Sequence, residues 1–270
     1  MTANEESRRG SSAGRWLSRA RALLDQIAET QMDTIDTVAG WCADTIGGGG
    51  LVHLFGSGHS RIPLEEMFPR YGSFPGFHPI AELSMTFHTE VVGTNGQRQA
   101  MFIERVEGLA EVILSNYHFG NNDLMMVFSS SGRSAVPVEM AIGASERGLK
   151  VIAVTSVAES MASEATHRSG TRLLDHADAV IDIGTPPGDA LVQLDGLDTP
   201  VGPGSTVANV AVVNEIKVQV ADRLLARGIT PTVLTSGSLV GEEKSRALFD
   251  DAYGDYAHRL ARVLDRGAGS

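Results

Sequence analysis

A strand, a turn and a helix are predicted by the residues Leu124-Met125-Met126-Val127-Phe128-Ser129-Ser130-Ser131-Gly132-Arg133-Ser134 and those that follow. The first five residues are apolar, and a short apolar run that ends at a turn is typical of a buried strand. The hydroxyl-rich turn 129–134 follows, and we expect a helix from Ser134 to about Arg147. A buried strand that passes through a Ser/Gly turn into a helix is the building unit of α/β proteins.

A second unit of this kind lies upstream. Residues 51–55 (Leu-Val-His-Leu-Phe) predict another buried strand, and the turn 56–60 (Gly-Ser-Gly-His-Ser) leads into a helix through Glu65, Glu66 and Met67. Further strands are predicted at 151–155 and 179–183, with strand pieces near 74–77. Apolar strands that alternate with helices indicate a parallel sheet covered on both faces, and right-handed crossovers make it a doubly wound α/β sandwich.

Helices flank this sheet. Apolar residues at steps of three and four from Ala13 onward predict a long N-terminal helix that ends before the glycines 47–50. Other helices are expected at 98–117, from Ser205 to about Arg227, and at 241–265, and a Gly/Pro-rich loop is expected at 184–204. Residues 1–12 and 266–270 have the polar composition of disordered tails, so we expect a single domain over 13–265.

Composition and charge exclude several classes of protein. The 270 residues are 42% hydrophobic and carry a formal net charge of −11. Because no basic stripe offsets this negative charge, we do not expect the protein to bind nucleic acid. Cys42 is the only cysteine, which rules out an intrachain disulfide and indicates a buried apolar role. The eight histidines lack the spacing of common metal motifs, so no metal is expected. No apolar run spans a membrane and no signal peptide is seen, so we expect a cytoplasmic protein.

The two turns form a plausible phosphate site. Both follow strand ends, where ligands bind in open parallel sheets, and both precede helices, whose first N–H groups attract anions. Serine hydroxyls add donors without adding charge, which suits an acidic protein. The competing phosphate and hydrolase motifs are absent: Arg61 replaces the third glycine of a dinucleotide fingerprint, and neither a Walker A loop nor a G-x-S-x-G elbow occurs. No cofactor is therefore expected.

The segments 54–60 and 127–134 resemble the two phosphate-loop signatures of the sugar isomerase (SIS) domain family. The resemblance covers about residues 40–235 and implies a three-layer sandwich with a five-stranded parallel sheet, flanked here by long N-terminal and C-terminal helices. It also implies a sugar phosphate ligand and a homodimer or higher homo-oligomer. Residues expected to contact the substrate or its phosphate are Ser57, Gly58, His59, Ser60, Ser129, Ser130, Ser131, Gly132, Ser134 and Ser205.

Within the family, the chain is similar to bacterial single-domain phosphosugar isomerases and to N-acetylglucosamine 6-phosphate dehydratase, and more distantly to N-acetylmuramic acid 6-phosphate etherase. The Val-Glu-Gly segment resembles the one that holds the base in the etherase, which points to Glu107. Glu65 or Glu66 resembles the helix glutamate of phosphoheptose isomerases. His88 is a candidate acid or sugar ligand, whereas Glu104 is expected on a solvated helix face.

The resemblance favours elimination of water from an N-acetylhexosamine 6-phosphate. A carboxylate base would remove the C2 proton of the open-chain aldehyde, and an acid would assist departure of the C3 hydroxyl. Isomerisation of an aldose phosphate to a ketose phosphate is the alternative enzymatic reading. A phosphosugar sensor without chemistry is a third possibility. The roughly forty residues before the first strand are expected to form one long helix with no helix-turn-helix break, which argues against a DNA-binding regulator but not against a protein-binding sensor.

Overall fold

Five parallel strands form the centre of the protein, as the resemblance predicted. The computed structural model describes residues 12–86 and 96–264. The strands are β1 (Val52–Gly56), β2 (Phe77–Ile80), β3 (Leu124–Phe128), β4 (Lys150–Thr155) and β5 (Ala179–Asp182). Their order is β2-β1-β3-β4-β5, and every neighbouring pair is parallel. Strand pieces were expected near 74–77, whereas the observed strand begins at Phe77 and continues to Ile80.

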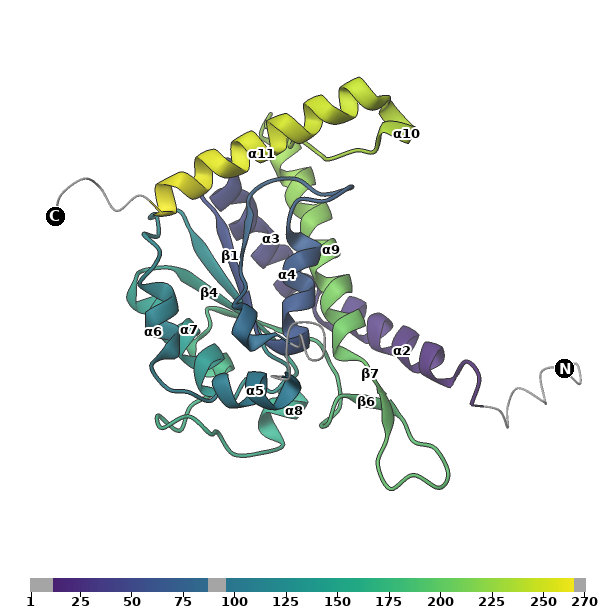
Figure 1. Cartoon of the computed structure of the whole chain (residues 1–270). Helices are drawn as coiled ribbons and strands as arrows, with labels where there is room; N and C mark the ends of the chain where they lie inside the picture. Colours follow the sequence, from purple (N-terminus) through teal and green to yellow (C-terminus); the bar gives the residue numbers. More distant parts are fainter. Residues whose placement is uncertain (1–11, 87–95, 265–270) are drawn as a thin grey trace, which may run out of the picture.

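Helices cover both faces of the sheet and complete the three-layer sandwich (Figure 1). One face packs against α2 (Arg15–Thr30), α3 (Met32–Gly47), α4 (Ile62–Met67) and α9 (Ser205–Ala226). The other packs against α6 (Leu109–Leu114) and α7 (Ala135–Glu146). Successive residues of a strand point to opposite faces, so Met126 joins the first core and Met125 and Val127 join the second. Cys42 is fully buried in the first core, as expected.

Two predicted helices are interrupted. The expected N-terminal helix is divided into α2 and α3, which meet at Gln31, a residue with φ −113° and ψ −6°. The helix expected at 98–117 is also divided, into α5 (Gly96–Ile103) and α6. The break between them contains Gly108, which has φ +86°, a left-handed value that favours glycine. This second break changes where the carboxylates of 104–107 point.

The remaining elements lie at the edges of the sandwich. The loop 184–204 contains an antiparallel hairpin, β6 (Ala190–Val192) with β7 (Val201–Pro203). After β4 comes α8 (Val157–Met161), and the chain ends in α10 (Gly237–Val240) and α11 (Glu242–Leu264), the latter close to the predicted bounds. None of the helices in the described residues has the length and apolar character needed to cross a bilayer.

Asp123 joins the starts of the two central strands. Its Oδ1 accepts the N–H of Leu51 at 2.8 Å, while Oδ2 accepts the N–H of Gly120 at 2.8 Å and lies 3.2 Å from Nε2 of His53. Burial raises the pKa of the Asp123 carboxyl, but the hydrogen bonds from His53, Leu51 and Gly120 together hold it below its usual value. The ionised carboxylate therefore stabilises the beginning of β1 against that of β3.

We expect Asp123→Ala to lower the free energy of unfolding by about 3 kcal/mol, because it leaves charge-assisted donors without an acceptor. A carboxyl with a depressed folded-state pKa contributes its stability above the unfolded pKa and loses it as the pH falls through the folded one. The difference between wild type and variant, measured by urea unfolding, should thus shrink below about pH 4. Asp251→Ala, on the exposed face of α11, is the control and should have little effect. A difference that persists undiminished in acid would contradict this account of Asp123.

Candidate functional site

The two serine loops meet because β1 and β3 are neighbours in the sheet. Gly56 is paired with Phe128, so Ser57 and Ser129 leave the sheet side by side at its carboxyl edge. The strand order 2-1-3-4-5 reverses direction between β1 and β3, and ligands bind at such a switch point in open α/β sheets. The sheet topology therefore brings both predicted loops to the expected place.

A cavity of about 530 Å3 lies at this edge. The described residues that line it are Ser57, Gly58, His59, Ser60, Gln97, Met101, Glu104, Ser129, Ser130, Ser131, Ser134, Glu159, Gly188, Asp189, Pro203, Ser205, Thr206 and Asn209. Hollows near Asp123, at the opposite edge of the sheet, are smaller, about 210 and 250 Å3. The described lining holds neither lysine nor arginine, so an anion would have to be held there by hydroxyls and backbone N–H groups.

The loop after β3 is held in shape by its neighbours. The hydroxyl of Ser129 accepts the N–H of Gly132 at 3.1 Å, and the carbonyl of Ser130 accepts the hydroxyl of Thr155 at 3.1 Å. Gly132 has φ +58°, and a Cβ there would lie 3.0 Å from Oγ1 of Thr155. The carbonyl of Gly132 also accepts the N–H of Leu173 at 2.7 Å. The tight turn thus needs glycine at this position and presents Ser131 to the cavity.

Glu104 connects the two loops. Its Oε2 accepts the hydroxyl of Ser57 at 2.8 Å and its Oε1 accepts the hydroxyl of Ser134 at 3.1 Å. Both serines occupy N-cap positions, yet neither hydroxyl caps its own helix. The carbonyl of Glu104 accepts the N–H of Val136 at 2.9 Å, in the first turn of α7. One carboxyl group therefore accepts hydroxyl hydrogen bonds from both loops.

Two other carboxylates line the cavity and already accept hydrogen bonds from backbone N–H groups. Asp189, which has φ +62°, accepts the N–H of Ser205 at 2.7 Å and its hydroxyl at 2.5 Å, and so stabilises the start of α9. Glu159 on α8 accepts the N–H of Gly188. These bonds fix the loop 184–204 against the sheet and leave Glu104 as the carboxylate bonded to both serine loops.

Asn209 places an unsatisfied buried polar atom on the cavity wall. The residue is 3% exposed, and its Oδ1 has no hydrogen-bond donor in the described part of the chain. A buried amide oxygen without a donor is costly, at about 1–3 kcal/mol. A ligand hydroxyl or amide N–H would supply the missing donor.

Nine of the ten residues expected to contact substrate line the cavity, and Gly132 shapes the loop behind it. The expected acids and bases lie elsewhere. Glu65 pairs with Arg61, and its side chain is 63% exposed. Glu66 lies 3.6 Å from Nζ of Lys217. Burial raises the pKa of Glu66, but Asn214, Lys217 and Arg70 together hold it below its usual value.

Glu107 also lies off the cavity wall, since its Oε1 accepts the N–H of Arg168 at 3.0 Å and faces His167 at 4.0 Å. His88 lies outside the described residues. Glu104 was expected on a solvated helix face, but it lines the cavity. A helical pattern through 98–117 placed it on a solvated face, but α5 ends at Ile103, and the turn that follows directs Glu104 into the cavity.

Comparisons with known proteins agree with this architecture. Residues 15–156 match the family model of the SIS domain. The chain is 35% identical over 245 residues to a UPF0309 protein of Streptomyces coelicolor, covering 90% of this chain and 95% of the relative. It is 33% identical to a UPF0309 protein of Listeria innocua, covering 84% and 90%.

Solved structures show more distant likenesses. A phosphoheptose isomerase from Francisella tularensis is 14% identical, with a TM-score of 0.49 over 82% of this chain and 98% of that chain. The Vibrio vulnificus NanR protein complexed with ManNAc-6P is 13% identical, with a TM-score of 0.47 over 93% and 71%. Identities this low carry no information about a reaction.

We expect Gly132→Ala to destabilise the protein more than Gly148→Ala. Both glycines have left-handed φ values, +58° and +82°, but a Cβ at Gly148 would meet no atom within 4 Å. Gly148→Ala should cost only the backbone strain, about 1–2 kcal/mol, whereas Gly132→Ala adds the contact with Thr155. Urea unfolding of both variants measures the difference. Equal losses would mean that the loop relaxes freely and that glycine is not required there.

Proposed function

Because the chain belongs to the SIS domain family, we propose that it binds a sugar phosphate in the cavity between the two serine loops and abstracts the C2 proton of the open-chain sugar. The observation that supports this most is that the hydroxyls of Ser57 and Ser134 donate to the two carboxylate oxygens of Glu104, one to each. Hydroxyl donors that meet from two strand ends are suited to hold a phosphate oxygen as well.

The phosphate is proposed to lie against the turn 129–134 and the start of α7. Ser131 lines the cavity. The helix N-terminus adds a favourable field for an anion. When phosphate takes the hydroxyl of Ser134, Glu104 loses one of its donors and becomes available to the sugar.

Glu104 is proposed as the base. Its carboxylate takes the proton from C2 of the aldehyde, and the electron pair of the C–H bond forms the enolate. In an N-acetylhexosamine 6-phosphate, the enolate then expels the C3 hydroxyl, which takes up a proton and leaves as water. Besides Glu104, the described titratable side chains on the wall are His59, Glu159 and Asp189, and the acid is proposed to be one of these three.

The acetamido group gives the orphaned amide of Asn209 a role. The acetamido N–H of the substrate is proposed to donate to the buried Oδ1 of Asn209. The proposal retains the homodimer and the cytoplasmic location expected from the sequence.

We expect Ser131→Ala to weaken binding of N-acetylglucosamine 6-phosphate about 10- to 100-fold, because a hydrogen bond to a charged group contributes about 1.5–3 kcal/mol. Isothermal titration calorimetry measures this, with N-acetylglucosamine as the matched ligand without phosphate. Ser115→Ala is the control, since that exposed hydroxyl donates to the carbonyl of Val112. Equal affinity of the wild type for sugar and sugar phosphate would remove the phosphate site from the proposal.

We expect Glu104→Gln to abolish solvent exchange at C2 of N-acetylglucosamine 6-phosphate while the sugar phosphate still binds. An amide accepts no proton, so exchange in deuterated water, followed by NMR, should fall at least about 100-fold. The exposed Glu65→Gln is the matched control and should exchange as the wild type does.

Three other results of these exchange and binding measurements would change the proposal. Full exchange in Glu104→Gln combined with its loss in Glu107→Gln would return the base to Glu107. Conversion of an unacetylated aldose phosphate to its ketose, without any reaction of the acetylated sugar, would replace elimination by isomerisation. Binding without exchange in the wild type would make the protein a sensor.

A further inference from the structure

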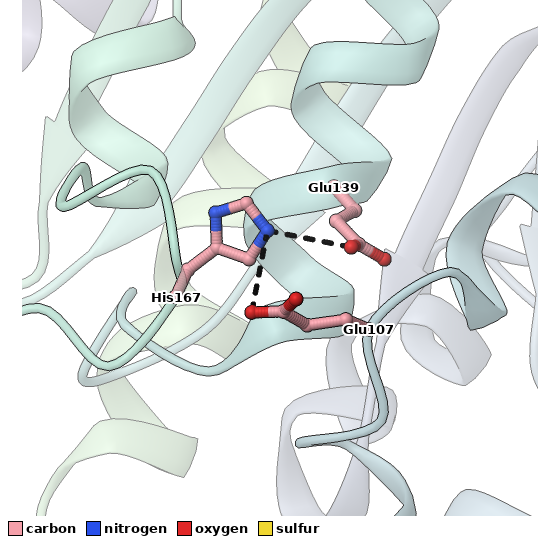
Figure 2. A group of neighbouring side chains, drawn as sticks. All are labelled: Glu107, Glu139 and His167. Carbon is pink, nitrogen blue, oxygen red and sulfur yellow. Dashed lines mark hydrogen bonds and ion pairs between the residues drawn. The ribbon is translucent and has the colours of Figure 1, made fainter.

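We propose that Glu107, Glu139 and His167 form a divalent cation site that binds Zn²⁺. The three residues are brought together from separate segments: the break between α5 and α6, the helix α7, and the loop that follows α8 (Figure 2). Their candidate ligand atoms all lie within 4.8 Å of one another. The site is distinct from the cavity, whose lining includes none of the three.

The distances suit a tetrahedral ion. Nε2 of His167 lies 3.3 Å from Oε1 of Glu139 and 4.0 Å from Oε1 of Glu107. Ligand atoms at about 2.1 Å from a tetrahedral Zn²⁺ are about 3.4 Å apart, so small side-chain movements would close the site around an ion. Figure 2 shows the same imidazole nitrogen facing both carboxylates. A water molecule would complete four ligands.

The histidine is oriented as a metal ligand. Its side chain is 5% exposed, and Nδ1 lies 2.7 Å from the hydroxyl of Ser169 and accepts the N–H of Ser169 at 3.4 Å. With Nδ1 accepting, Nε2 carries the ring proton and donates to Glu139 at 3.3 Å. A Zn²⁺ ion at Nε2 would displace this proton, and Nδ1 would then donate to the hydroxyl of Ser169, which is the usual arrangement around zinc. With Nδ1 committed to Ser169, the nitrogen that remains is the one that faces the two carboxylates.

The carboxylates are held by backbone N–H groups. Glu139 accepts the N–H of Gly108 at 3.0 and 2.8 Å, and Glu107 accepts the N–H of Arg168 at 3.0 Å. The guanidinium of Arg168 lies 3.4 Å from Oε2 of Glu107, but that side chain is 76% exposed, so solvent screens its charge. Two carboxylates therefore face one imidazole, and a cation would compensate the negative charge between them.

The ligand set favours zinc over the hard cations. Imidazole nitrogen suits Zn²⁺, whereas Mg²⁺ and Ca²⁺ prefer oxygen ligands alone and more of them. A bound ion would join the segment 105–108, which follows Glu104 directly, to α7 and to the loop 162–172. It would therefore be a structural site that fixes the backbone next to the cavity without touching a ligand there.

Titration of the metal-stripped full-length protein with Zn²⁺, in competition with a chromophoric chelator, tests the site. We expect one ion per chain, a higher melting temperature in its presence, and little response to Mg²⁺. His167→Ala and Glu139→Gln should each weaken binding more than about 10-fold. Glu146→Gln is the matched control, since this exposed carboxylate lies on the same helix as Glu139.

The readout needs no sugar and no turnover, so it is independent of the proposed reaction. Circular dichroism checks that the variants fold. If His167→Ala fails to fold, Glu107→Gln replaces it, because this change lies in a loop and keeps the side-chain volume. Failure of the wild type to bind Zn²⁺, or equal binding by the wild type and the ligand variants, would overturn the site and leave an ion-pair cluster.

Discussion

The parallel pairing of β1 with β3 is the constraint on which the cavity depends. It sets Gly56 opposite Phe128, so that two serine loops leave the sheet at the same height and at the point where the strand order reverses. Asp123 stabilises the other end of the same two strands through the N–H groups of Leu51 and Gly120. A slip of one residue in this register would turn every side chain of β1 to the other face and would separate Ser57 from Ser134.

Glu104 accepts hydrogen bonds from the hydroxyls of both serine loops. A phosphate bound at the proposed site would compete with Glu104 for these two donors. An acidic protein with no lysine or arginine on the described cavity wall can hold a phosphate only through neutral donors and a helix terminus. Under the proposed function, the same hydroxyls would link occupancy of the phosphate site to the freedom of the carboxylate.

The segment 104–108 connects the cavity to the cluster behind it. Glu104 faces the serines, whereas Glu107 faces His167, and the carbonyl of Glu104 accepts an N–H from the first turn of α7. Gly108, with its left-handed φ, donates its N–H to Glu139 on that same helix. A short non-helical turn, rather than a helix, therefore sets the directions of both carboxylates.

The sequence by its own patterns predicted β1, β3, β4 and β5, both serine loops and most of the cavity's hydroxyls, because these features are local; β2 was matched only at Phe77. Apolar runs of five residues, Ser/Gly turns and helical periodicity depend on neighbours in the chain. The direction of the carboxylates was decided by tertiary structure. Glu104 and Glu107 are three residues apart, and a helix would have placed them on one face; the break after Ile103, held by contacts with α7, sends them to different places. The cluster of Glu107, Glu139 and His167 had no spacing to reveal it, because packing alone brings together three segments that are distant along the chain.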